Sequence, residues 1–121
     1  MTFTIDDISG GVRVRFDEPR LDAAIAIRFK DRLREVAARH GPLILLDLSP
    51  VGFMDSSGLG AILAIRRTLT PPRRIELTGL TPNVDRVFRL TRMDTIFTIH
   101  AEGPGLAPPS GDTASDSEVR P

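Results

Sequence analysis

The stretch LILLDLSPVGFMDSSGLG, residues 43–60, decides the fold of this chain. It opens with a continuous apolar run, Leu43 to Leu46, which predicts a central strand buried on both faces of a parallel sheet. After a polar loop, apolar residues at helical spacing predict a helix over about Ser57 to Leu69. An apolar strand that leads through a short loop into a helix is typical of α/β proteins.

The residues on either side continue this alternation of strands and helices. From Val12 to Phe16, apolar residues alternate with arginines, which is the period of a strand with one buried face. Asp22 is expected to cap a helix, and Gly41 with Pro42 is expected to end it. The further expected elements are strands at 2–5, 75–77 and 95–99, and a third helix that starts at Pro82 and buries Val84, Val87, Phe88 and Leu90.

Strands separated by helices predict parallel pairing, because a helix provides the long crossover that parallel neighbours need. The N-terminal strands are expected to differ, since Ser9, Gly10 and Gly11 form a turn signal that predicts an antiparallel hairpin. We therefore expect an α/β fold with one domain. Its sheet should be mixed but mostly parallel, with about four to five strands and helices packed on it.

The composition argues against several classes of function. The chain has 121 residues, the size of one domain, with 16 basic and 16 acidic residues. Neutrality argues against direct nucleic-acid binding, which usually requires a basic excess. With no cysteine and two histidines, a transition-metal site is not expected. The chain has neither an apolar run that could cross a membrane nor a signal-peptide pattern, so we expect a cytoplasmic protein without a membrane partner.

Residues 101–121 differ in composition from the rest of the chain. They are rich in Pro, Gly and Ser, and they contain four acidic residues and one arginine. With almost nothing to bury, such a segment does not offset its ordering entropy, so we expect a disordered acidic tail after a domain at residues 1–100. We also expect that removal of the residues after about Gly103 leaves folding unchanged.

The loop after the predicted central strand is the most informative segment for function, because sites in open α/β sheets form at the carboxyl ends of strands. Asp55, Ser56 and Ser57 are candidate caps for the following helix. Gly58 and Gly60 would allow another backbone or a ligand to approach closely. The residues expected to form an exposed apolar patch beside these groups are Phe53, Met54 and Leu59.

No catalytic motif fits these residues. A P-loop needs a lysine after its glycines, and a dinucleotide fingerprint needs a small residue where Leu63 stands. Neither Ser56 nor Ser57 has a glycine on both sides at the spacing of a nucleophile elbow. Asp47 and Asp55 lack a third acidic neighbour for Mg²⁺. We therefore predict no catalytic residue and no metal site in this chain.

The sequence LLDLSPVGFMDSSGLGAIL resembles the signature of the STAS domain, and specifically that of the anti-sigma factor antagonists of bacterial partner-switching systems. The resemblance covers residues 1–100, with the same order of strands and helices, and its most specific part is D-S-S-G-L-G. Two places depart from the family pattern. The loop before the first helix has Pro19 and no glycine, and Arg92 with Met93 stands where a Gly-Leu pair is frequent.

The resemblance implies a phosphorylation switch rather than an enzyme. It assigns Ser57 as the phosphorylated residue, the anti-sigma factor as the serine kinase, and a PP2C-type phosphatase as the opposing enzyme. The kinase would supply ATP and Mg²⁺ from its own site, so this chain needs no cofactor. Unphosphorylated, the chain would bind the anti-sigma factor and free the sigma factor, and phosphorylation would abolish this binding. The implied partner-binding residues are Asp22, Phe53, Met54, Asp55, Ser56, Ser57, Gly58 and Leu59.

Two other functions stay open. The chain could be a STAS interaction module of a stressosome-like or transporter-associated complex, or a sensor of small molecules such as nucleotides. The sequence from Asp55 to Ser57 favours the antagonist, because interaction modules of this family often lack the acceptor serine. No phosphate-binding lysine near Gly58 supports the sensor.

Overall fold

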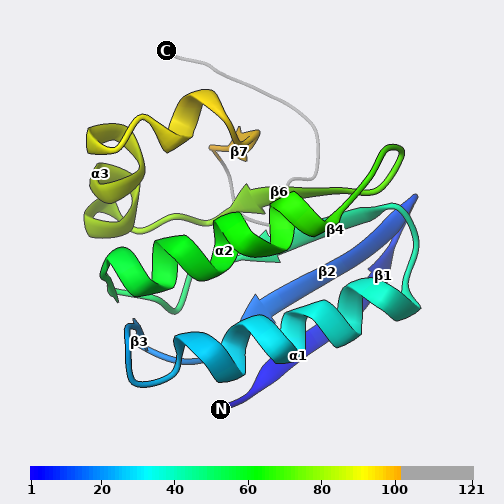
Figure 1. Ribbon diagram of the computed structural model, residues 1–121, viewed down its shortest axis with the longest axis horizontal. Helices are drawn as coiled ribbons and strands as arrows, with labels where there is room; N and C mark the ends of the chain where they lie inside the picture. The colour runs from blue at the N-terminus through cyan, green and yellow to red at the C-terminus, as the bar shows by residue number, and fades with distance from the viewer. Residues whose placement is uncertain (102–121) are drawn as a thin grey trace.

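The computed structural model describes residues 1–101, which form a five-stranded sheet with helices packed on it (Figure 1). The strands are β1 (Phe3–Ile8), β2 (Gly11–Phe16), β3 (Arg20–Leu21), β4 (Leu43–Asp47), β5 (Phe53–Met54), β6 (Arg74–Thr78) and β7 (Ile99–His100). The helices are α1 (Ala26–Arg39), α2 (Ser56–Thr68) and α3 (Pro82–Leu90), with a short 3-10 helix, η1 (Met93–Thr95). This is the α/β alternation that the sequence predicts.

The sheet has the strand order β1-β2-β4-β6-β7, with β3 and β5 forming a separate pair. β1 and β2 are antiparallel, as the turn signal predicts, and Gly10 at the turn has a φ of 82°, a conformation that glycine adopts without steric cost. All other pairs of the sheet are parallel, and β4 lies at its centre between β2 and β6. The predicted mixed, mostly parallel sheet is therefore confirmed.

One face of the sheet carries the core. α1 and α2 lie side by side over this face (Figure 1). Val12, Val14 and Phe16 point into the core from β2, and the parallel register sets Val12 beside Ile44 of β4. Phe16 meets Phe29 of α1 edge to face, with ring centroids 4.9 Å apart. The apolar residues of β2 thus face the core, as their alternation with arginines predicts.

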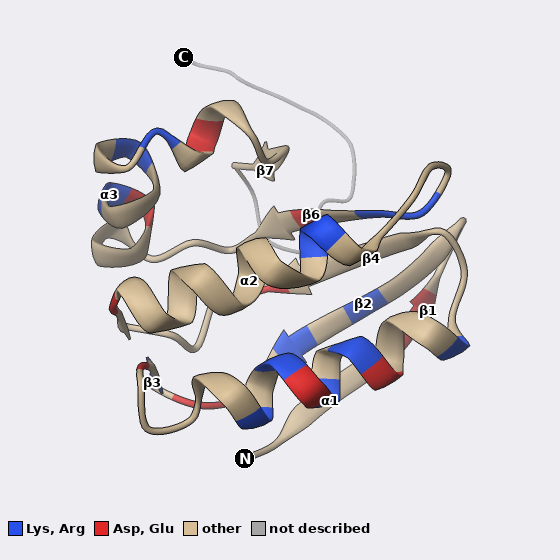
Figure 2. Ribbon diagram, in the orientation of Figure 1, with Lys and Arg blue, Asp and Glu red and all other residues tan. Residues whose placement is uncertain are grey.

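The opposite face of the sheet corrects one expectation. β4 is not buried on both faces, because Leu43 and Leu45 are only half-buried. The register sets Leu45 between Arg13 of β2 and Glu76 of β6, so polar side chains border it on this face. Basic and acidic residues are interspersed over α1 and spread over several other elements (Figure 2).

Three predicted boundaries or faces also differ from the structure. α1 begins at Ala26 rather than directly after Asp22, since a turn fills the intervening residues. The last strand covers only Ile99–His100, because η1 occupies the start of the predicted strand. Leu90 is 77% exposed, so α3 buries Val84 and Phe88 but not its last leucine. The predicted tail, except for Ala101, lies outside the described residues.

Candidate functional site

The loop between β4 and α2 is held by three other segments. The Gly52 N–H donates to the carbonyl of Pro19, 2.9 Å away, in the loop before β3. The Thr81 hydroxyl, at the start of α3, donates to the carbonyl of Val51 at 2.7 Å. The Leu48 N–H donates to the carbonyl of Thr78 at the end of β6. These bonds satisfy backbone groups of the loop and fix the position from which α2 starts.

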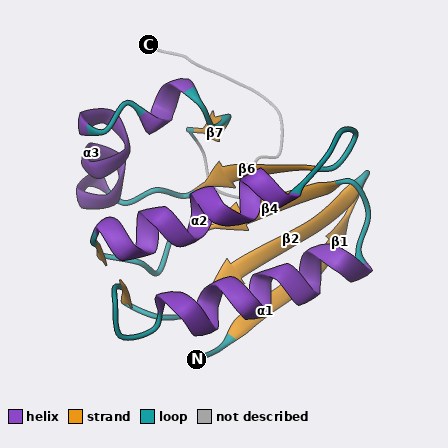
Figure 3. Cartoon of the chain, viewed as in Figure 1, coloured by secondary structure: helices purple, strands orange, loops and turns teal. Residues whose placement is uncertain are grey.

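A pair of short strands connects this loop to the segment before α1. β3 and β5 pair in parallel, with Arg20 beside Phe53 and Leu21 beside Met54, next to the start of α2 (Figure 3). The Arg20 guanidinium lies over the Phe53 ring, 4.2 Å from its centroid, in a cation–π contact. Phe53 still has 40% of its surface exposed. The ring is therefore available at the surface while its backbone is held.

Asp55 is the N-cap of α2 and binds three backbone amides. Its Oδ1 accepts from the N–H groups of Ser57 and Gly58, at 2.9 and 3.0 Å. Its Oδ2 accepts from the N–H of Ala23 at 3.2 Å. The Gly58 amide is the leading cause of a pKa below the ordinary value for the Asp55 carboxyl, with Ala23 and Ser57 adding to it against the effect of burial. Of the three candidate caps, Asp55 alone has this role.

Asp22 organises the turn before α1. Its Oδ1 accepts from the N–H of Ala24 at 3.1 Å, and its Oδ2 accepts from Arg20 Nε at 3.1 Å. Its carbonyl accepts from the N–H groups of Ile25 and Ala26. The side chain thus stabilises a turn rather than capping the first residues of α1 directly. Through the adjacent Ala23, this turn is joined to Asp55.

Ser56 and Ser57 occupy the first turn of α2, and both are exposed. Within residues 1–101, neither hydroxyl has a hydrogen-bond partner, and Asp55 binds the amides of Ser57 and Gly58 in this turn. Ser57 also lines a groove of about 250 Å³ between α1 and α2, whose walls include Ile27 and Lys30. Ser56 does not line this groove, so the two serines lie in different surroundings.

Gly58 and Gly60 prove to have different roles. A Cβ at Gly58 would lie 2.3 Å from the carbonyl oxygen of Leu21, so the helix approaches the β3 backbone as closely as glycine permits. A Cβ at Gly60 would have no heavy atom within 4 Å among its surroundings. The prediction of a close backbone approach is correct at Gly58. At Gly60 the space is open, and the residue lines the groove beside Ser57.

The predicted apolar patch is wrong in its extent. Met54 is 4% exposed and Leu59 is 8% exposed, and both belong to the core. In β5, successive side chains point to opposite faces, so Met54 points inward and Phe53 outward. Phe53 is therefore the exposed part of the expected patch. Gly58 is also buried. It can affect a contact surface only by allowing α2 to approach the backbone of Leu21.

The groove walls beside Ser57 are not evident from the sequence. Ile27 is 69% exposed although it lies on α1, whose apolar residues mostly face the core. Lys30 also lines the groove, and the only feature that distinguishes it in the sequence is that it is the single lysine of the chain. Within the described part of the chain, no group of three His, Cys, Asp or Glu side chains could hold a metal ion. His40 lies near Asp7 and His100 near Glu76, so neither contacts Ser57.

The sequence and the fold of this chain are both similar to those of known proteins. The family model of the STAS domain matches residues 3–102. The "Anti-sigma-B factor antagonist" of Listeria monocytogenes is 30% identical over 80 residues, which cover 65% of this chain and 70% of the relative. None of the helices among residues 1–101 has the length and apolar character needed to cross a membrane.

The fold is shared with solved structures of other proteins. An anti-sigma factor antagonist from Mycobacterium paratuberculosis has a TM-score of 0.76 at 24% identity, covering 86% of this chain and 88% of that one. The phosphorylated form of the Bacillus cell fate determinant SpoIIAA has a TM-score of 0.61 at 20% identity, covering 86% and 96%. At these identities, the likeness concerns the fold.

Proposed function

The chain belongs to the STAS domain family, among the anti-sigma factor antagonists, and on this basis we propose that it is a phosphoserine-regulated antagonist in a partner-switching system. In this proposal the unphosphorylated chain binds an anti-sigma factor that is also a serine kinase, and the sigma factor is freed for transcription. Phosphorylation of Ser57 abolishes the binding, and a PP2C-type phosphatase restores it. These events take place in the cytoplasm, where a sigma factor acts.

The observation that carries the proposal is the state of Ser57. Its amide is bound by Asp55, while its hydroxyl is exposed and has no partner within residues 1–101. The hydroxyl is therefore presented on a fixed backbone, which suits an acceptor of a phosphoryl group. Ser57 is favoured over Ser56 because it also lines the groove with Ile27 and Lys30, a surface that a partner could contact.

The cap explains how a phosphate at this position could change binding. Phosphorylation adds about −1.5 to −2 charges and three acceptor oxygens. The free amides of a helix N-terminus usually bind such an anion, but here Asp55 already accepts hydrogen bonds from the amides of Ser57 and Gly58. A phosphate would compete with the Asp55 carboxylate for these amides and repel it. The hydrogen bond from Ala23 to Asp55, and with it the turn at Asp22, would then be affected.

Binding would fall for a second reason. Phe53 is exposed beside the start of α2, and an apolar residue of this kind favours a dry contact with a partner. A dianion placed in such a contact without a matching cation is costly to desolvate. The proposed switch is thus a local change of charge and hydrogen bonding at one surface, while the fold is retained. Under this proposal the chain is the substrate of chemistry performed by its partners, which hold the ATP and Mg²⁺.

The test uses the anti-sigma factor kinase of the same organism with radiolabelled ATP. We expect the wild-type chain and Ser56→Ala to incorporate phosphate, and Ser57→Ala to incorporate none. In a binding assay with the same anti-sigma factor, Ser57→Asp should bind much more weakly than wild type, with an unchanged circular dichroism spectrum. Label retained in Ser57→Ala would exclude Ser57 as the acceptor. Equal binding of wild type and Ser57→Asp would exclude the switch.

A further inference from the structure

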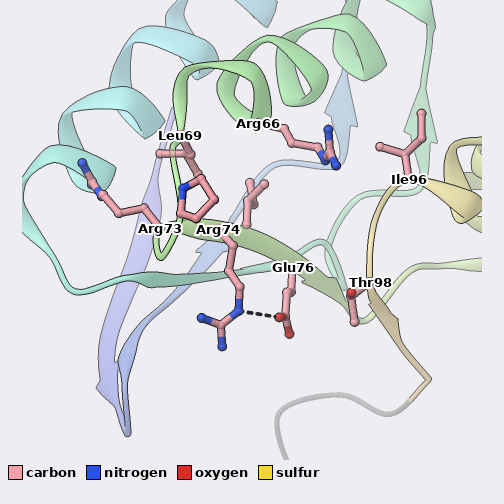
Figure 4. Close-up of a pocket in the computed structure, with 9 residues that line it drawn as sticks. Arg66, Leu69, Arg73, Arg74, Glu76, Ile96 and Thr98 are labelled. Carbon is pink, nitrogen blue, oxygen red and sulfur yellow. Dashed lines mark hydrogen bonds and ion pairs between the residues drawn. The ribbon is translucent and has the colours of Figure 1, made fainter.

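A second cavity lies at the other end of α2, where the chain leads into β6 (Figure 4). Its volume is about 310 Å³, and its lining includes Arg66 of α2, Arg74 of β6 and Thr98 before β7. Ser57 and Gly60, which line the first groove, take no part in it. The proposed phosphorylation switch does not use this region.

Ile75 of β6 lines this cavity. Its side chain is buried, but its backbone lies on an edge of the sheet that no other strand covers among residues 1–101. β7 pairs with β6 only at Leu77 and Thr78. The Arg74 N–H donates toward β4, to the carbonyl of Pro42, and the Leu77 N–H donates the opposite way, to the carbonyl of Thr98. Because alternate residues of a strand direct their backbone groups to opposite sides, the N–H and C=O of Ile75 face the side of β7. Among residues 1–101, no strand pairs with Ile75 on that side.

The cavity has an excess of positive charge. Arg66, Arg73 and Arg74 line it, against Glu76 as the acidic member. Glu76 is already bound by Arg74 Nε at 2.9 Å and by His100 Nε2 at 2.8 Å.

Within residues 1–101, the other two arginines that line the cavity, Arg66 and Arg73, form no salt bridge. In the described part of the chain, no carboxylate lies within ion-pairing distance of Arg66, whose guanidinium carbon lies over the Phe97 ring, 5.8 Å from the ring centroid. In Figure 4 its guanidinium points toward Ile96. The Nη2 atom of Arg73 is buried and has no hydrogen-bond partner among residues 1–101. Within residues 1–101, Arg66 therefore stands beside the unpaired strand edge without a counter-charge, whereas the Arg73 side chain extends away from the other lining residues (Figure 4).

We propose that the edge of β6 at Ile75 is a docking site for an extended acidic segment of a partner protein. The segment would add to the sheet as a short strand, and its backbone would pair with the N–H and C=O of Ile75. A carboxylate of the segment would bind Arg66. Ile96, which is 39% exposed, would pack against its apolar side chains. A second copy of this chain is a poor occupant, because two such edges would bring their arginines together.

The test is a fluorescence anisotropy titration with a labelled synthetic peptide in which Glu and Val alternate. Two control peptides separate the contributions: one has Lys in place of Glu, and the other is the acidic peptide with N-methylated backbone amides, which cannot pair as a strand. We expect only the unmodified acidic peptide to bind, and more weakly as salt is added. Arg66→Gln should weaken the binding about tenfold, whereas Arg67→Gln, an exposed neighbour outside the cavity, should not.

Further outcomes would overturn the proposal. Equal binding of the N-methylated and unmodified peptides would exclude strand addition, and equal affinity of Arg66→Gln and wild type would exclude the charge contact. A doubled mass in sedimentation equilibrium, reduced by Arg66→Gln, would identify a second copy as the occupant instead. Stronger peptide binding after Asp112→Asn, Asp116→Asn and Glu118→Gln together would identify the chain's own acidic residues as the occupant. The binding site itself is checked by the amide resonance of Ile75, which should shift on titration.

Discussion

The carboxylate of Asp55 accepts a hydrogen bond from the backbone N–H of Ala23, 3.2 Å away, although 32 positions separate the two residues. The same carboxylate caps α2 through the amides of Ser57 and Gly58. One side chain therefore fixes both the start of the helix that presents Ser57 and the turn that contains Asp22. These two segments are therefore joined through Asp55.

Substitution of Asp55 should lower stability in proportion to the hydrogen bonds lost. Asp55→Asn keeps one acceptor oxygen and Asp55→Ala keeps none, so at pH 7 the melting temperature should fall from wild type to Asn to Ala. The folded-state pKa lies below the ordinary 3.8, so the contribution of the carboxylate is complete above that value. It is lost as the pH falls through the lowered pKa.

The difference in melting temperature between wild type and Asp55→Asn should therefore narrow in acid. Calorimetric scans from neutral pH to below the ordinary carboxyl pKa would measure this. Asp31→Asn is the control, because this side chain is 60% exposed and should change the scans little. A difference that stays constant down to the lowest pH would contradict the role assigned to the ionised Asp55.

Alanine at Gly58 and at Gly60 should have opposite effects on stability. At Gly58 the new Cβ would lie 2.3 Å from the carbonyl oxygen of Leu21, and the resulting strain should cost about 2 kcal/mol or more. At Gly60 the space is open, and the better helix propensity of alanine should add about 1 kcal/mol. Urea unfolding of both variants would test this, and stability changes of the same sign would refute the distinction.

The apolar residues of α3 provide a matched pair for the core. Phe88 is fully buried and meets Phe97 edge to face at 5.9 Å, so Phe88→Ala should cost about 3–5 kcal/mol of unfolding free energy. Leu90→Ala, at 77% exposure on the same helix, should change it by no more than about 0.5 kcal/mol. A large loss for Leu90→Ala would mean that α3 packs with its last turn against the domain.

Phe53 should matter for binding more than for folding. Because 40% of its surface is exposed, Phe53→Ala should cost less than about 1 kcal/mol of stability. If the chain binds its anti-sigma factor through this surface, the same change should weaken the complex about tenfold or more. Calorimetric titration of the folded variant measures the affinity. An unchanged affinity would remove Phe53 from the partner surface while leaving the test of Ser57 unaffected.

Periodicity was sufficient to predict the two strands that form the middle of the core. The alternation from Val12 to Phe16 and the apolar run from Leu43 to Leu46 correctly indicate the strands of the core. The run from Leu43 to Leu46 predicts two buried faces, which is wrong for one of them. A short apolar run does not reveal which residues lie beside it in the sheet. On the less buried face, the neighbours of Leu45 are Arg13 and Glu76. They belong to other strands, and only the strand register places them beside Leu45.

The details of the site were beyond such patterns. β3 and β5 have two residues each, which is too short for an alternation to be visible. Without β5, there was no reason to separate the inward Met54 from the outward Phe53. The bond between Asp55 and Ala23 depends on tertiary packing, so the sequence indicated a cap but not its second role. The assignment of Ser57 as the acceptor stays a prediction.

The pairing of β3 with β5 has a consequence for any enzyme that modifies this surface. Arg20 and Phe53 are neighbours only once the chain has folded, since the segment between them includes the whole of α1 and β4. A kinase that must bind both β3 and β5 would not phosphorylate a short peptide that contains Ser57, nor an incompletely folded or unfolded chain. Modification would then report on completed folding, and only intact molecules would enter the regulatory cycle.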